Sequence, residues 1–132
     1  LPEGTRIDTP SGPVPVERLR TGDLVIGYHG EPVVIRKIDQ YDEDPDTTSH
    51  LTVTFSSGSE VSLSPRHRIG GIPAGQLRSG ERVGSFLVTG VRPLAKVSRS
   101  FDLLTEDRGY RIEGVPVNSM IAEMAAHART VE

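Results

Sequence analysis

A hydroxyl and an imidazole lie three positions apart in the stretch SLSPRHRI, residues 62–69, as Ser64 and His67. An imidazole titrates near neutral pH and can donate a proton, and a serine hydroxyl can hydrogen-bond a reacting group beside it. Cleavage of a peptide bond needs both, because the planar amide must be twisted and its nitrogen protonated as it leaves. Ser64 and His67 are therefore a candidate site for amide chemistry. The alternative interpretation is that both are ordinary turn residues.

The segment before this pair predicts the element that positions it. Apolar residues alternate on both sides of a Ser-Ser-Gly turn, which predicts a β-hairpin over residues 50–64. His67 comes just after the second strand, and we expect the strand to fix the direction in which the His67 side chain points. Further strands are predicted within residues 5–10, 13–19, 23–30, 32–41, 81–94, 96–106 and 110–117.

The rest of the chain predicts one exposed loop and one helix. Residues 41–50, YDEDPDTTSH, form an acidic, turn-rich segment. Residues 119–131 predict a helix with one apolar face, formed by Ile121, Met124, Ala128 and Val131. The expected fold class is therefore all-β with a short C-terminal helix.

The two halves of the sequence share a pattern. PVPVERLRTGDLV, residues 13–25, and GIPAGQLRSGERV, residues 71–83, have the same order of Pro, Leu-Arg, a small hydroxyl residue, Gly, an acid and Val. The leucines, Leu19 and Leu77, are 58 positions apart. We interpret this as a duplicated β unit, which predicts two pseudo-equivalent subdomains with a shared cleft. Two unrelated glycine corners are the alternative.

Composition limits the classes of function. With 132 residues the chain is expected to form one domain that buries roughly 65–70% of its unfolded surface. It has no cysteine, which excludes disulfides, thiolate metal sites and a cysteine nucleophile within these residues. The net charge of −3 is spread along the chain without a basic stripe, so no nucleic-acid partner is expected. No apolar run is long enough to predict a membrane span.

Four stretches together resemble the Hint domain family, which is shared by hedgehog C-terminal domains, inteins and bacterial intein-like proteins. LPEGTRIDTPSGPVPVERLRTGDLVIG resembles the N-terminal block, and GSEVSLSPRHRI resembles the second block with its Thr-x-x-His pattern. SFDLLTEDRGYRIEGVPVNS resembles the two C-terminal blocks. The resemblance covers about residues 1–119, and residues 120–132 are then a helical tail.

The resemblance implies a horseshoe-shaped fold of two pseudo-two-fold related β subdomains and a single-turnover autoprocessing reaction. A Cys or Ser at the start of the domain attacks the preceding carbonyl and converts an amide into an ester or thioester. A second nucleophile, water or a sterol then takes the acyl group. In splicing, a terminal Asn cyclises and releases the domain.

The same resemblance assigns catalytic roles to five residues. Ser64 and His67 would hold and protonate the reacting peptide, and Asp102 would orient or protonate a departing or attacking group. The side chain of Asn118 would attack its own carbonyl and cut the bond to Ser119. Without the family pattern, Asp102 could equally pair with Arg99 or Arg111, and His29, His50 and His127 are expected on the surface without metal-ligating spacing.

The sequence departs from the family at both junctions. The family's first nucleophile would immediately precede Leu1, so we expect it to be absent from these residues. The family's usual penultimate His is Val117 here. Asn118 and Ser119 also precede the predicted helix, where either could serve as an N-cap worth about 1 kcal/mol. A helix cap and a splice junction both remain open.

The sequence therefore predicts an autoprocessing Hint domain that undergoes an N-terminal acyl shift leading to self-cleavage, acyl transfer or splicing. Its expected partner is the covalently attached flanking polypeptide, on which it acts in cis as a monomer, without a cofactor, a metal or a membrane. Two alternatives are a degenerate Hint fold that serves as a non-catalytic linker or interaction module, and an unrelated β-barrel that binds a ligand.

Overall fold

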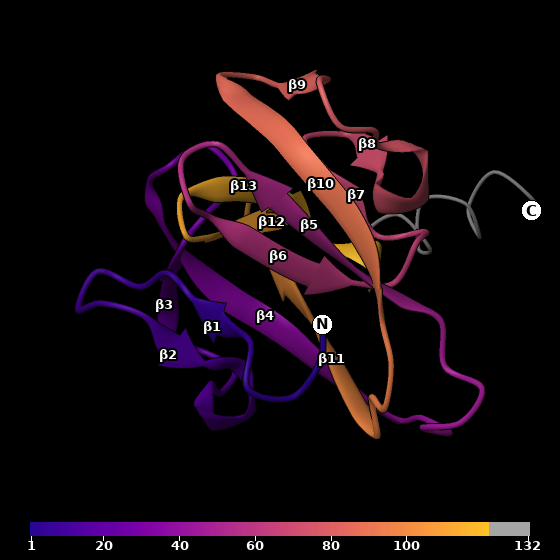
Figure 1. Ribbon diagram of the computed structural model, residues 1–132. Coiled ribbons are helices and arrows are strands. Elements are labelled where there is room, and N and C mark those ends of the chain that lie inside the picture. The colour runs from indigo at the N-terminus through magenta and orange to yellow at the C-terminus, as the bar shows by residue number, and fades with distance from the viewer. Residues whose placement is uncertain (122–132) are drawn as a thin grey trace, which may run out of the picture.

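The computed structural model describes residues 1–121, and the regular structure in this part is almost entirely β (Figure 1). The all-β prediction is confirmed. Most of the predicted helix, including Met124, Ala128 and Val131, lies outside the described residues. The elements are β1 (Arg6–Ile7), β2 (Val14–Pro15), η1 (Val16–Arg18), β3 (Leu24–Ile26), β4 (Pro32–Asp42), β5 (His50–Phe55), β6 (Glu60–Leu63), β7 (Arg68–Ile69), β8 (Ile72–Pro73), η2 (Ala74–Gln76), β9 (Arg82–Val83), β10 (Phe86–Leu94), β11 (Arg99–Thr105), β12 (Gly109–Ile112) and β13 (Val115–Asn118), where η marks a single-turn 3-10 helix.

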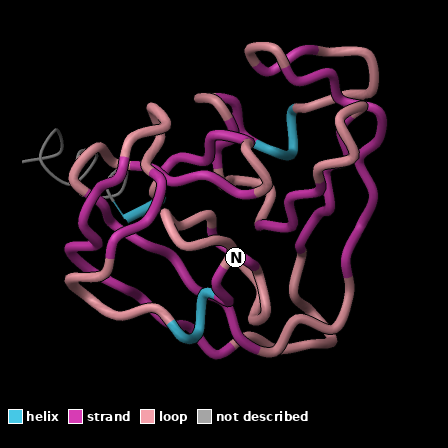
Figure 2. The backbone as a smooth tube through the Cα atoms, turned by 90° about the vertical axis from the view of Figure 1, so that its left-hand side faces the viewer, coloured by secondary structure: helices cyan, strands magenta, loops and turns pink. Residues whose placement is uncertain are grey.

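The strands of residues 1–121 pair antiparallel in small sheets. The sheet orders are β1-β2, β6-β5-β10-β9, β11-β4-β3 and β12-β13-β7-β8. The two longest strands, β4 with 11 residues and β10 with 9, each lie between two neighbours. Figure 2 shows that the sheets curl around the middle of the molecule, where the N-terminus lies.

The predicted hairpin forms as β5 and β6. Leu51 pairs with Leu63 and Val53 pairs with Val61, and the side chains of three of these four residues are buried. The chain turns directly after β6, where the backbone N–H of His67 donates to the carbonyl of Ser64 at 3.1 Å. The hairpin therefore places the candidate pair at the end of a strand, as expected.

The sequence repeat is a structural repeat. Each copy has a two-residue strand, a 3-10 turn and a leucine in extended conformation, with φ −77° and ψ 151° at Leu19 and φ −75° and ψ 142° at Leu77. Gly22 and Gly80 both have φ +95°, a conformation that glycine adopts without strain. The strand predicted over residues 13–19 was too long. Pro15 lacks the N–H that would continue a β-ladder, and a 3-10 turn follows it.

The two copies exchange strands, which gives the pseudo-two-fold arrangement that was predicted. In the first copy, β4 pairs with its own β3 and with β11 of the second copy. In the second copy, β10 pairs with its own β9 and with β5 of the first copy. Their buried aliphatic side chains form one shared core that includes Val25, Ile35, Val53, Val88 and Leu103. None of the helical turns in residues 1–121 is long and apolar enough to cross a membrane.

Candidate functional site

The first residue of the chain is held inside the molecule. The nitrogen of Leu1 donates to the carbonyl of Phe101 at 2.7 Å, and the Phe101 N–H donates to the carbonyl of Leu1 at 2.7 Å. Pro2 and Ser100 form an isolated antiparallel bridge. The side chain of Leu1 is buried as well. The N-terminal backbone therefore lies as a short extended segment along β11.

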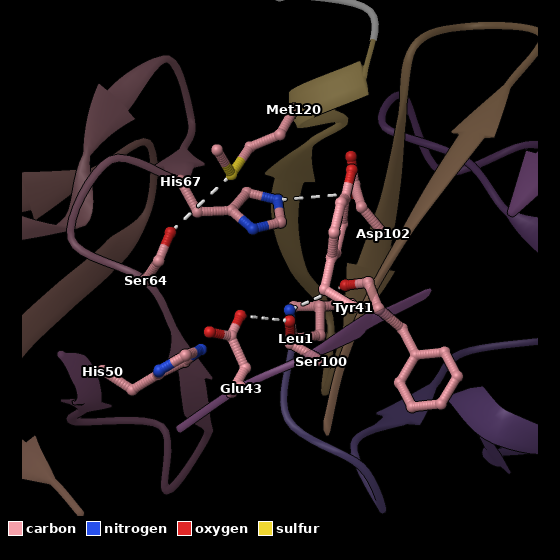
Figure 3. A pocket seen from close by; sticks show the side chains of 10 residues that line it. Leu1, Tyr41, Glu43, His50, Ser64, His67, Ser100, Asp102 and Met120 are labelled. Atoms are coloured by element: carbon pink, nitrogen blue, oxygen red, sulfur yellow. Dashed lines mark hydrogen bonds and ion pairs between the residues drawn. The ribbon is translucent and has the colours of Figure 1, made fainter. Parts of the chain in front are cut away.

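A cavity of about 260 Å³ opens beside Leu1. Figure 3 shows its polar lining, which comes from segments far apart in the sequence: Ser64 and His67 after β6, Asp102 on β11, Glu43 just after β4, and His50 at the start of β5. Three of the five predicted site residues thus line one cavity together with the N-terminus.

His67 is 1% exposed, and its contacts fix its tautomer. Nε2 lies 2.7 Å from the carbonyl oxygen of Asn118 and 3.1 Å from the hydroxyl of Tyr110. A carbonyl can only accept a hydrogen bond, so Nε2 carries the hydrogen and Nδ1 of the neutral ring carries a lone pair. In Figure 3 the nitrogen joined to Asp102 by a dashed line is Nε2, and the other ring nitrogen faces the side of the cavity that holds Leu1.

The surroundings of His67 favour its neutral form. Burial, followed by repulsion from the nearby N-terminal ammonium, lowers the pKa of His67 to about 3. At neutral pH the ring is therefore a proton acceptor at Nδ1 and a hydrogen-bond donor at Nε2. Both functions are needed when a proton is first taken from a nucleophile and then given to a leaving nitrogen.

Asp102 is joined to His67 through Tyr110. The Tyr110 hydroxyl donates to Oδ1 of Asp102 at 2.9 Å, and Oδ2 of the same carboxyl accepts from the backbone N–H of Ile121 at 2.7 Å. Nε2 of His67 lies 3.7 Å from Oδ1. Burial raises the pKa of Asp102, although these hydrogen bonds act in the opposite direction. The three side chains form a hydrogen-bonded cluster below the protein surface.

The alternative pairing of Asp102 with an arginine was wrong. Arg99 lies 3.4 Å from Glu3, and the guanidinium of Arg111 donates to the carbonyl of Tyr28. Asp102 points inward from β11 instead, because side chains alternate across a strand.

Sequence reasoning missed Tyr110. The side chain is fully buried, and its hydroxyl provides the only link by hydrogen bonds between His67 and Asp102 among the residues described here. The available signal was the alternation of Tyr110 with Ile112 in a short strand. A tyrosine on the buried face of a strand needs a partner for its hydroxyl.

Ser64 lies at the edge of the same cavity. It is half-buried, and its hydroxyl donates to Sδ of Met120 at 3.7 Å. Its position beside His67 agrees with the predicted grouping, while its hydroxyl is bonded to Met120 and not to the backbone of Leu1.

Asn118 ends β13, and Ser119 follows it directly. The Asn118 carbonyl accepts from His67, and Oδ1 of Asn118 accepts from the Gly71 N–H at 2.8 Å. Ser119 is buried, and its hydroxyl has no partner within residues 1–121. Asp102, not Asn118 or Ser119, binds the N–H of Ile121. In the described part of the chain neither residue acts as the helix cap considered above.

His50 is not on the surface, in contrast to the expectation. It begins β5, pairs with Leu94 and is 5% exposed, because the strand starts at the last residue of the predicted acidic loop. His29 is exposed as expected, and His127 lies outside the described residues. Within residues 1–121 no three His, Asp or Glu side chains are grouped closely enough to hold a metal ion.

Comparison with known proteins gives a family and a fold. The family model described as "Hint domain" matches residues 1–77. The MchDnaB-1 intein, in the crystal structure of its N145AA form, superposes with a TM-score of 0.77 at 22% identity, covering 90% of this chain and 98% of that chain. A bacterial intein-like domain from Clostridium thermocellum superposes with a TM-score of 0.72 at 20% identity, covering 89% and 96%. The gp41-1 intein gives 0.72 at 15% identity, with the same coverage. No curated protein sequence matches the chain.

Proposed function

We propose, because this chain belongs to the Hint domain family, that it rearranges the peptide bond at its own N-terminal junction. The reaction is an acyl shift onto the side chain of the residue that would precede Leu1, followed by cleavage, acyl transfer or splicing. Residues 1–119 form the catalytic domain in this proposal, and residues 120–132 form a tail. The substrate is the attached polypeptide.

The observation that carries the proposal is the burial of the Leu1 nitrogen in the cavity that contains His67. Burial lowers the pKa of the free amine there to about 6, which means that a charged ammonium is disfavoured. An amide N–H donates the same hydrogen bond to Phe101 without a charge. The site is therefore better suited to a peptide nitrogen than to a chain terminus.

The register along β11 supports a role for Asp102. Pro2 lies opposite Ser100 and Leu1 exchanges both hydrogen bonds with Phe101, so one more residue upstream would lie opposite Asp102. Such a non-hydrogen-bonded pair brings side chains close together on one face of a sheet. A nucleophilic Ser or Cys at that position would have the Asp102 carboxyl beside it.

The acyl shift can be written with the groups in the cavity. The hydroxyl or thiol of the preceding residue attacks the carbonyl carbon on its N-terminal side and gives its proton to Nδ1 of His67. The C–N bond then breaks, and His67 returns the proton to the leaving nitrogen. The products are an ester or thioester and a free amine, and His67 is regenerated in its neutral form.

His67 also contacts the proposed C-terminal junction. The Nε2–H of His67 donates to the carbonyl of Asn118, which is the carbonyl that the Asn118 side-chain amide would attack during cyclisation. A donor at this oxygen stabilises the negative charge that develops on it. We propose that His67 supplies this donor where Val117 replaces the family's penultimate His. Ser119 would then be the first residue of the released C-terminal segment.

The proposal is tested with a reporter protein fused through a single Cys to Leu1. Incubation with dithiothreitol is expected to release the reporter, and His67→Ala is expected to slow the release at least about 100-fold, the lower range for loss of an acid-base group. His29→Ala is the matched control, because this histidine is exposed. A fusion that stays intact under all conditions contradicts autoprocessing and favours a non-catalytic Hint module.

A further inference from the structure

We propose that His50 is a second catalytic base in the cavity and that it activates water or a small hydroxyl compound as the acceptor of the acyl group. The inference rests on the proposed function, since it concerns the step after the acyl shift. It names both the residue and the chemical class of acceptor.

The first supporting observation is that the His50 ring is buried but makes no hydrogen bond that would stabilise the fold. It is 5% exposed, and its Nδ1 is fully buried with no hydrogen-bond partner. Among the described residues neither ring nitrogen of His50 makes a hydrogen bond. A buried polar group without a partner costs about 1–3 kcal/mol, so a residue of this kind requires an explanation.

The second observation is its position. His50 and His67 both line the cavity, and in Figure 3 they lie on different sides of it, with the ring of His50 directed toward the carboxyl of Glu43. Oε1 of Glu43 accepts from the hydroxyl of Ser100 at 2.7 Å, which fixes the carboxyl near the N-terminal nitrogen. Glu43 can therefore stabilise an imidazolium at His50, while His67 remains committed to the two junction peptides.

The third observation concerns charge and space. Burial lowers the pKa of His50, so the ring is available at neutral pH as a base. The cavity volume of about 260 Å³ is well above the roughly 10–15 Å³ that a single water needs. Half-buried Ser64 and Met120 and exposed Tyr41 form part of its lining, so a small acceptor can enter.

The step balances with these groups. The acceptor hydroxyl attacks the carbonyl carbon of the ester or thioester while its proton moves to Nε2 of His50, because Nδ1 is closed off from the cavity. The bond from that carbon to the sulfur or oxygen of the junction residue breaks, and the released thiolate or alkoxide takes a proton from the imidazolium. The acyl group leaves as a carboxylic acid with water, or as a new ester with an alcohol.

The test separates acceptors by their need for a base. In the Cys-linked reporter fusion, we expect His50→Gln and His50→Phe to reduce hydrolysis and transfer to 1 M ethanol at least tenfold. Release by dithiothreitol at pH 8.5 should change less than twofold, because an attacking thiolate has no proton to lose. The acid and the ethyl ester are distinguished by mass spectrometry. His29→Gln is the control.

Each result is decisive. Loss of hydrolysis with intact thiol release supports the inference. Unchanged hydrolysis in both His50 variants overturns it, and an equal loss of hydrolysis and thiol release overturns it too, because His50 would then act on the fold or on the first step. Absence of thiol release from the unsubstituted fusion overturns the proposed function itself, whereas the His50 results alone leave that function standing.

Discussion

At the scale of single residues, His67 connects both ends of the described domain. One ring nitrogen donates to the carbonyl of Asn118, and the other faces the N-terminal segment. The hydrogen bond at Nε2 determines that the lone pair lies at Nδ1. The contact with Asn118 therefore leaves Nδ1 able to accept a proton on the side of the N-terminal segment, as the proposed acyl shift requires.

Tyr110 positions this ring, and its removal should affect chemistry more than packing. Tyr110→Phe keeps the buried aromatic ring but leaves Oδ1 of Asp102 and Nε2 of His67 without the shared hydroxyl. We expect a loss of about 1–3 kcal/mol in unfolding free energy. The thiol-induced release rate should fall about tenfold, which corresponds to about 1.4 kcal/mol.

The same variant should also change the pH dependence of release, since Asp102 loses a donor to its charged form and its pKa rises further. Chemical denaturation and release rates from pH 5 to pH 9 measure both effects, with Tyr28→Phe as the control. A release profile identical to that of the unsubstituted fusion would mean that the Tyr110 hydroxyl is only structural.

The buried amine predicts a pH dependence of stability in the polypeptide that starts at Leu1. The amine has a pKa of about 6 when folded and 8.0 when unfolded, so the unfolded chain binds more protons between these values. Stability from this group is therefore complete above pH 8 and is lost as the pH falls to 6, by about 2–3 kcal/mol. N-terminal acetylation of Leu1 removes the titrating amine and should abolish this loss. Urea unfolding of both forms at pH 6 and pH 8.5 measures the change in unfolding free energy between the two pH values. An equal change in both forms would contradict the burial of the Leu1 nitrogen.

The sequence was informative about some site residues and silent about others. Ser64, His67 and Asp102 carry family motifs, and all three line the cavity. His50 was assigned to the surface because its neighbours are acidic and turn-forming, although burial is decided by the strand that begins at His50. The partner of Tyr110 depends on β12 lying over His67, a long-range contact that local patterns do not contain.

At the scale of elements, the two corners formed by η1 and η2 hold the long strands. Leu19 and Leu77 occupy equivalent places after these turns and are 8% and 4% exposed. Leu19→Ala and Leu77→Ala should each lower the unfolding free energy by about 2–4 kcal/mol, since each opens a cavity in the core. Leu24→Ala is the control, because this leucine is 51% exposed. Thermal or urea denaturation gives the values, and a small effect at only one corner would contradict their equivalence.

Strand positions were predictable to the extent that alternation and turns fix them. The β5 and β6 hairpin follows from alternating Leu51, Val53, Val61 and Leu63 around a glycine turn. The 3-10 turns were missed, because PVPV reads as alternation although Pro15 cannot continue a ladder. The exchange of β5 and β11 between copies was also beyond local reasoning, since pairing partners far apart in sequence are chosen by the whole fold.

At the scale of the whole molecule, the exchanged strands bring the N-terminal segment and the end of β13 together. β11, which belongs to the second copy, lies beside both β4 and the N-terminal segment, and β13 ends at His67 from the other side. Figure 1 shows the N-terminus in the middle of the fold, next to β11. The N-terminal segment and the end of β13 therefore lie near the same imidazole, which the proposed processing of both junctions requires.

A ¹⁵N NMR titration of the His67 ring measures its protonation state and tautomer directly. We expect a neutral ring with its hydrogen on Nε2 from pH 8 down to pH 5, because the pKa of His67 is lowered to about 3 and Asn118 accepts from Nε2. A ring that is charged at pH 7, or one that carries its hydrogen on Nδ1, could not accept the proton of a nucleophile at the N-terminal junction, and either result would rule out His67 as the base of the acyl shift.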